Sequence, residues 1–268
     1  MKKEIIEFGK RMDAAEDKAL LVDYAEGATR VLDLGAGTGK ISRDIAEKYG
    51  AHCDAIDIQF KDNCQNSDGV TYYGMSIKDF FMNEVYGDTK YDCIILSAIL
   101  HELSESDIGN LEWYLPKVMA DNCRIIIREP FYGTSLGPVV KEEKRFIDLV
   151  SSHISAKKAI EYIQTPKLSD EDYTKKTFCS STDWANLAFV VSYGEQSWER
   201  EKHELRYARD LNWLKEKFNL RTRPFTGFQV YSVLDKTYRD HFIKAGIPGE
   251  AFDLIQYTGM IIVIDYSK

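Results

Sequence analysis

The sequence predicts an α/β fold: a doubly wound, mostly parallel sheet of seven strands, with a helical insert after the fifth strand. Three observations support this fold class. The chain has 268 residues, 44% of them hydrophobic, which is enough for one sizeable domain with an insert. Its first half alternates short apolar runs with amphipathic segments, as parallel β-α units do. A glycine-rich turn directly follows the first of these runs.

Hydrophobic periodicity predicts the elements of the first half. An amphipathic helix over 3–26 ends at Gly27, and the strand over 91–97 is almost unbroken in apolar residues, as expected in the middle of a parallel sheet. The other elements expected here are a strand over 30–34, a helix over 38–49, strands over 52–57 and 70–73, helices over 77–84 and 105–120, and a strand over 124–128.

The regular alternation stops after Arg128. A helix over 140–163, a polar stretch over 165–182, an apolar segment over 183–192 and a charged helix over 197–218 follow. Strands over 226–234 and 258–266, with a helix over 237–245 between them, complete the sheet. We expect a main domain of residues 1–132 and 199–268, with residues 133–198 inserted as a cap or substrate-binding segment.

The insert is rich in aromatic side chains. As a cap, it would lie at the carboxyl edge of the sheet, where open α/β sheets bind ligands, and would cover a substrate. Most of the rings, taken singly, are better explained as the segment's own small core. They are Phe146, Tyr162, Tyr173, Phe178, Trp184, Phe189 and Tyr193.

Composition narrows the class of protein. The net charge of −8 argues against a broad nucleic-acid footprint, and no apolar run approaches the length of a membrane span. The five cysteines form no CxxC pair, and three of them lie in or beside apolar strands, so we expect buried thiols and no metal. This usage is typical of a reducing, cytoplasmic compartment. The cysteines are Cys53, Cys64, Cys93, Cys123 and Cys179.

The glycine-rich turn predicts a ligand site. It begins at Asp33 and places Gly35, Ala36, Gly37 and Gly39 between a strand and a helix, where a ligand can lie against the backbone. A dinucleotide GxGxxG fingerprint fails, because its third glycine would stand where the chain has a lysine. Asp33 either orients the turn and a ligand's ammonium group or caps the turn.

A second acidic residue, Asp57, follows the glycines by about twenty residues, at the end of the next strand. In a Rossmann-like unit a carboxylate at this point accepts hydrogen bonds from the two ribose hydroxyls of an adenosine. The alternative is an aspartate that caps the next loop.

Together these residues resemble the first motifs of class I S-adenosylmethionine (SAM) dependent methyltransferases, and residues 28–132 resemble the small-molecule O-methyltransferases among them. The resemblance implies a SAM cofactor bound by Asp33, Gly35, Ala36, Gly37, Gly39 and Asp57. It adds Ile58, Met75, Ser76 and Ser97 as further cofactor contacts. The acidic residue usual after the third strand is not evident: Met75 can pack on the adenine, while Ser76 or Asp79 can meet its exocyclic amine.

Candidate catalytic residues follow the fourth and fifth strands. His101 stands where the resembling family has the histidine that removes the acceptor's proton, and Glu102 replaces the family's aspartate. The alternative for His101 is a side chain that only lines the pocket. Glu129 can orient His101, bind a cationic acceptor, or form a salt bridge or cap. An HExxH zinc site is excluded, because Glu105 stands where the second histidine is required.

The leading interpretation is therefore a SAM-dependent methyltransferase acting on a small-molecule acceptor, with O- and N-methylation both open. RNA or protein methylation, a non-catalytic methyltransferase-like subunit, and another SAM-dependent transfer are the alternatives. Neither a nucleic-acid partner nor a membrane is expected, and the oligomeric state is open.

Overall fold

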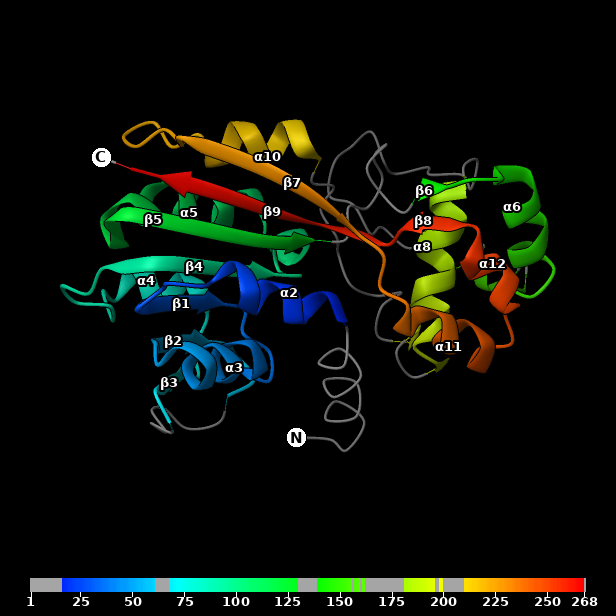
Figure 1. Cartoon of the computed structure of the whole chain (residues 1–268), viewed down its shortest axis with the longest axis horizontal. Helices are drawn as coiled ribbons and strands as arrows, with labels where there is room; N and C mark the ends of the chain where they lie inside the picture. Colours follow the sequence, from blue (N-terminus) through cyan, green and yellow to red (C-terminus); the bar gives the residue numbers. More distant parts are fainter. Residues whose placement is uncertain are drawn as a thin grey trace. The chain divides into compact units, whose positions relative to one another are not determined.

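The computed structural model describes residues 16–60, 68–129, 139–155, 157–159, 161, 181–195, 198–199 and 210–267. The chain divides into two compact units (Figure 1). The sheet unit comprises residues 17–129, 211–231 and 261–268. The helical unit comprises residues 1–16, 130–210 and 232–260.

The sheet unit is built on a seven-stranded sheet in the order β3-β2-β1-β4-β5-β9-β7. The pairs β1–β2, β2–β3, β1–β4 and β4–β5 are parallel, and Figure 1 shows β9 running against β5. The predicted doubly wound, mostly parallel fold is confirmed. Its strands are β1 (Arg30–Leu34), β2 (His52–Ile56), β3 (Val70–Tyr73), β4 (Tyr91–Ser97), β5 (Met119–Glu129), β7 (Gly227–Val233) and β9 (Gly259–Tyr266).

Both faces of this sheet are covered. In β1 and β4 four successive residues are buried, Val31–Leu34 and Cys93–Leu96, so side chains pointing to either face avoid water. The register pairs Leu34 with both Ile56 and Leu96, which brings the carboxyl ends of β1, β2 and β4 to one edge. The loops that follow these three strands therefore meet at that edge.

Among the described residues, the α-helices that accompany the sheet are α2 (Glu16–Tyr24), α3 (Lys40–Tyr49), α4 (Ile77–Met82), α5 (Glu105–Val118) and α10 (Leu211–Phe218). A capping box between Ser104 and Asp107 begins α5. The helix packs beside α4, where Phe81 stacks on Tyr114 with ring centroids 5.4 Å apart. This stack holds the end of α4 against the third turn of α5.

The helical unit has its own core. A two-stranded antiparallel sheet joins β6 (Val139–Val140) to β8 (Ile255–Tyr257), and the described part of the unit also contains four helices. They are α6 (Glu143–Ser151), α8 (Ser181–Ser192), α11 (Thr237–Lys244) and α12 (Gly249–Asp253). Phe146 is fully buried in this core, and Trp184, Phe189 and Tyr193 pack against it, as expected for rings that form the segment's own core. Tyr162, Tyr173 and Phe178 lie outside the described residues.

Several predicted boundaries differ from the structure. The helix expected over 140–163 contains turn and bend residues after Ser151, and the helix expected over 197–218 is interrupted at Asp210. The helical unit also takes residues 232–260, which we had assigned to the main domain. The reason is packing: Phe242 of α11 and Phe252 of α12 are buried in the same core as Phe146. No helix among the described residues is long and apolar enough to cross a membrane.

Candidate functional site

A cavity of about 250 Å³ lies at the carboxyl edge of the sheet unit. The loops after β1, β2, β3 and β4, together with the first turns of α4 and α5, form its wall. Its lining includes six of the predicted site residues, namely Gly35, Asp57, Ile58, Met75, Ser76 and Glu102. It also includes Gln59, Ile99, Leu103, Asp107 and Asn110, for which we had predicted no role.

The Asp57 carboxylate connects the glycine turn to the end of β2. Its Oδ2 accepts a hydrogen bond from the Gly37 N–H at 2.8 Å, and its Oδ1 accepts one from the Gln59 N–H at 2.8 Å. Burial raises the pKa of Asp57, and the two backbone hydrogen bonds oppose that shift. Each carboxylate oxygen can accept one further bond, so Asp57 can hold two adjacent hydroxyl groups of a ligand in the cavity.

The glycines of the turn serve different purposes. Gly35, Gly37 and Gly39 all have left-handed backbone angles, with φ between +60° and +74°. A Cβ on Gly35 would lie 2.7 Å from Cγ1 of Ile99, so Gly35 makes room for that side chain. A Cβ on Gly37 would meet nothing within 4 Å, so the backbone there is open to a ligand.

Two polar atoms at the ends of β1 and β4 are buried with no hydrogen-bond partner among the described residues. Asp33 is fully buried at the end of β1; its Oδ2 accepts a hydrogen bond from the Ser42 hydroxyl at 2.7 Å, and its Oδ1 has no partner within the described structure. Burial raises the pKa of Asp33 to about 6. The Ser97 hydroxyl, at the end of β4, is likewise buried without a described partner. Neither residue lines the cavity itself.

Glu129 holds the loop after β4. Its side chain is fully buried, and its Oε1 accepts hydrogen bonds from the backbone N–H groups of Ile99 at 2.7 Å and Leu100 at 2.6 Å. Its Oε2 lies 2.7 Å from Nδ1 of His101. This carboxylate thus organises the turn η1 (Leu100–Glu102) as well as the imidazole. Of the roles considered for Glu129, orientation of His101 agrees with this geometry.

His101 is buried, with 6% of its side chain exposed. When Glu129 accepts the proton on Nδ1, the lone pair of the neutral imidazole is on Nε2, which lies 3.8 Å from Oε1 of Glu102. His101 does not line the cavity, although Ile99 and Glu102 on either side of it in the chain do. His101 and Glu129 are therefore next to the cavity wall, and a proton on Nδ1 that points to Glu129 would leave Nε2 as the proton acceptor.

The lining of this cavity includes a large apolar residue, Ile58, that is exposed to solvent. The residue is 74% exposed and lines the cavity next to Asp57, and Met75 lines the cavity as well. Large apolar side chains exposed in a concave, partly polar site are typical of ligand pockets. The lining therefore combines apolar surface with a carboxylate that can accept two hydroxyls.

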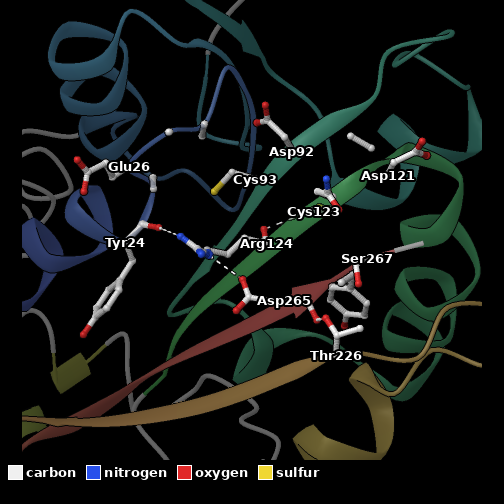
Figure 2. Close-up of a pocket in the computed structure, with 16 residues that line it drawn as sticks. Tyr24, Glu26, Asp92, Cys93, Asp121, Cys123, Arg124, Thr226, Asp265 and Ser267 are labelled. Carbon is white, nitrogen blue, oxygen red and sulfur yellow. Dashed lines mark hydrogen bonds and ion pairs between the residues drawn. The ribbon is translucent and has the colours of Figure 1, made fainter.

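A second, larger cavity of about 660 Å³ lies at the opposite edge of the same sheet, by the amino ends of β4 and β5 (Figure 2). Arg124 is its main structural feature: Nε donates to Oδ1 of Asp265 at 2.8 Å, and Nη1 donates to the Tyr24 carbonyl at 3.0 Å. None of the predicted site residues lines this cavity. Cys93 and Cys123 line it as buried thiols, and burial raises the pKa of Cys123 to about 12.

No protein-family model and no curated protein matches the sequence. Solved structures are similar in fold. A protein of Nostoc punctiforme PCC 73102, provisionally assigned as an O-methyltransferase, has a TM-score of 0.50 and 12% identity, and the match covers 98% of this chain and 60% of that one. A SAM-dependent methyltransferase from Archaeoglobus fulgidus has a TM-score of 0.48 and 14% identity, with 93% and 92% of the two chains covered. The 1,6-didemethyltoxoflavin-N1-methyltransferase of Burkholderia thailandensis, solved with 1,6-didemethyltoxoflavin and S-adenosylhomocysteine, has a TM-score of 0.47 and 10% identity, over 94% and 78%.

At these identities the likeness defines the fold alone. The chain has the Rossmann-like fold of class I SAM-dependent methyltransferases, as its motifs predicted. It spans 60% of the length of the Nostoc protein, so the activity of that whole protein bears on this chain only as a proposal.

Proposed function

We propose that this protein is a SAM-dependent methyltransferase that transfers a methyl group to a small-molecule acceptor. The observation that supports this most strongly is the bond between the Gly37 N–H and Oδ2 of Asp57, 2.8 Å long, beside the cavity that Gly35 and Asp57 line. It joins an open glycine backbone to a carboxylate at the edge where parallel α/β sheets bind ligands.

The cavity's chemistry is suited to the cofactor. Asp57 would accept hydrogen bonds from the two ribose hydroxyls, and Ile58 and Met75 would cover the faces of the purine. The buried, partnerless Oδ1 of Asp33 would attract the cofactor's ammonium group, directly or through water, and the Ser97 hydroxyl would lie near the same end. The backbone of Gly35, Ala36, Gly37 and Gly39 would lie against the amino-acid part. Ser76 would contribute as part of the cavity wall.

The bound cofactor would supply an electrophilic methyl group on a sulfonium. The protein's own part is to align the acceptor, which can lower a barrier by about 7–11 kcal/mol, and to receive a proton. For a hydroxyl acceptor, Nε2 of His101 would take the proton as the new C–O bond forms, and Glu129 would stabilise the resulting imidazolium. Glu102, 3.8 Å from Nε2, would add negative charge at the same imidazole. A neutral amine acceptor needs no strong base.

We also propose that residues 133–198 supply acceptor contacts. In the chain they come shortly after Glu129, as the insert that follows the fifth strand. The identity of the acceptor is left to experiment.

Incubation with SAM carrying a ¹³C-labelled methyl group and a panel of hydroxylated and amine metabolites tests this function by mass spectrometry. We expect a labelled product with the wild type, none with Asp57→Ala, and a strongly reduced yield with His101→Ala when the acceptor is a hydroxyl. Full transfer by Asp57→Ala would contradict the assignment of this cavity to the cofactor.

A further inference from the structure

The adenine end of the cavity lacks the acidic residue that we expected after the third strand. Ser76 and Asp79 were the candidates for the exocyclic amine. The Ser76 hydroxyl instead donates to Oδ2 of Asp79 at 2.7 Å and accepts from the Asp79 N–H at 3.0 Å, so it caps α4. Asp79 does not line the cavity. Neither residue therefore presents a carboxylate to the cavity.

Three carboxylates line the cavity: Asp57, Glu102 and Asp107. Asp57 is joined to the glycine turn, and Glu102 lies beside His101. Asp107 is the one that lies on α5, the helix that packs beside α4, and it lines the cavity together with Ile77, Lys78 and Phe81 of α4. It is the carboxylate left to meet the base.

We propose that Asp107 and Asn110, on α5, recognise the Watson–Crick edge of the purine; this inference rests on the proposed function. The two residues are three positions apart on one helix, so their side chains lie on the same face, and both line the cavity. Adenine presents there an exocyclic N6–H donor and an N1 acceptor. A carboxylate accepts from N6–H, and an amide Nδ2 donates to N1.

The capping box leaves Asp107 able to do this. Ser104 directs both its N–H, at 3.2 Å, and its hydroxyl, at 2.6 Å, to Oδ2 of Asp107. Within the described residues Oδ1 has no recorded hydrogen bond. The capping box therefore fixes the side chain through one oxygen, and the other oxygen is available to N6–H at no further cost in side-chain order.

The test compares two ligands, S-adenosylhomocysteine and S-inosylhomocysteine, by calorimetric titration. Inosine has an acceptor at position 6 and an N1–H donor, so it reverses both bonds. We expect the wild type to prefer the adenosyl ligand by roughly 5- to 150-fold, the discrimination typical of a paired edge contact. Asp107→Asn should reduce that ratio to near one or invert it, because an amide can donate to O6. Asn110→Asp should also shift the ratio toward the inosyl ligand, because a carboxylate accepts from N1–H.

Ser104→Ala is the matched control. It removes the Ser104 hydroxyl and leaves the Ser104 N–H to hold Oδ2 of Asp107, so it should lower the melting temperature by about 2–4 °C and reduce the ratio less than Asp107→Asn does. Unchanged ratios in both Asp107→Asn and Asn110→Asp, in proteins that still bind S-adenosylhomocysteine, would overturn this inference alone. A wild type that binds neither ligand would overturn the proposed function with it. Because Asn110 is outside the capping box, its variant gives an answer even if Asp107→Asn fails to fold.

Discussion

Replacing Glu129 with glutamine tests the organisation of the loop after β4. An amide in the same position keeps an oxygen for the N–H groups of Ile99 and Leu100, which now lie 2.7 and 2.6 Å from Oε1. It places an NH₂ group where Oε2 now faces Nδ1 of His101. The imidazole must then accept at Nδ1 and carry its proton on Nε2, which is the opposite of the tautomer that a base at Nε2 requires.

The magnitude follows from the bonds that are lost. A hydrogen bond to a charged group contributes about 1.5–3 kcal/mol, against about 0.5–1.5 kcal/mol for a neutral one. Glu129→Gln should therefore cost about 1–1.5 kcal/mol of unfolding free energy for each bond that becomes neutral. Glu129→Ala removes all three hydrogen bonds to the carboxylate, each worth about 1.5–3 kcal/mol, so it should cost at least about 3 kcal/mol.

Urea unfolding measures these losses, and ¹⁵N shifts of the His101 ring report its tautomer. Glu102→Gln is the matched control: that side chain is 52% exposed and 3.8 Å from the ring, so the change in stability should be no more than about 0.5 kcal/mol. An unchanged His101 tautomer in Glu129→Gln, together with a loss of stability no larger than that of the control, would refute this reasoning.

Three further outcomes are expected. Burial raises the folded-state pKa of Asp33 from 3.8 to about 6, so its protonation stabilises the fold at low pH and this stabilisation, about 3 kcal/mol, is lost as the pH rises from about 4 through 6. The unfolding free energy of Asp33→Asn relative to wild type should therefore increase over that range, and a flat difference would exclude a buried carboxyl with a raised pKa. Gly35→Ala should destabilise the protein by about 2–4 kcal/mol, because the added methyl would overlap Ile99 and the backbone φ is +74°. Gly37→Ala has open space around the added methyl, so it should cost only about 1 kcal/mol and instead weaken S-adenosylhomocysteine binding. Equal losses of stability in the two variants would be inconsistent with the packing described. Arg124→Ala should lower the unfolding free energy, measured by thermal unfolding, by about 1 kcal/mol. Most of this loss comes from the hydrogen bond to the Tyr24 carbonyl, because the ion pair with Asp265 is half-exposed and weak. A loss above about 3 kcal/mol would show that the ion pair is not weak.

The sheet was the most predictable part of the protein. The bounds of β1, β3 and β4 agree with those expected from apolar runs, because parallel strands buried on both faces are continuous hydrophobic segments. The position of Asp57 could also be predicted from the sequence, because one β-α-β unit sets the spacing between the glycines and the end of the next strand. Local pattern and tertiary structure agree in these elements.

Other features depend on contacts that no local pattern encodes. Trp198 to Phe218 has apolar residues at helical spacing, yet the helix is interrupted at Asp210. The bonds of Glu129 to Ile99, Leu100 and His101 could be predicted only from the pairing of β5 with β4. Asp107 has the sequence signature of a capping box, and that pattern carries no sign of the cavity. Packing of α5 against α4 brings it there.

Calorimetric titration of S-adenosylhomocysteine into the wild type and Asp57→Ala is the most direct test of the cofactor site. Loss of the carboxylate removes the acceptor for two ribose hydroxyls, each bond worth about 1.5–3 kcal/mol, so we expect micromolar binding by the wild type and at least about a 100-fold weaker affinity for the variant. Equal affinities for the two proteins, or no binding by the wild type, would contradict a SAM site at this edge of the sheet.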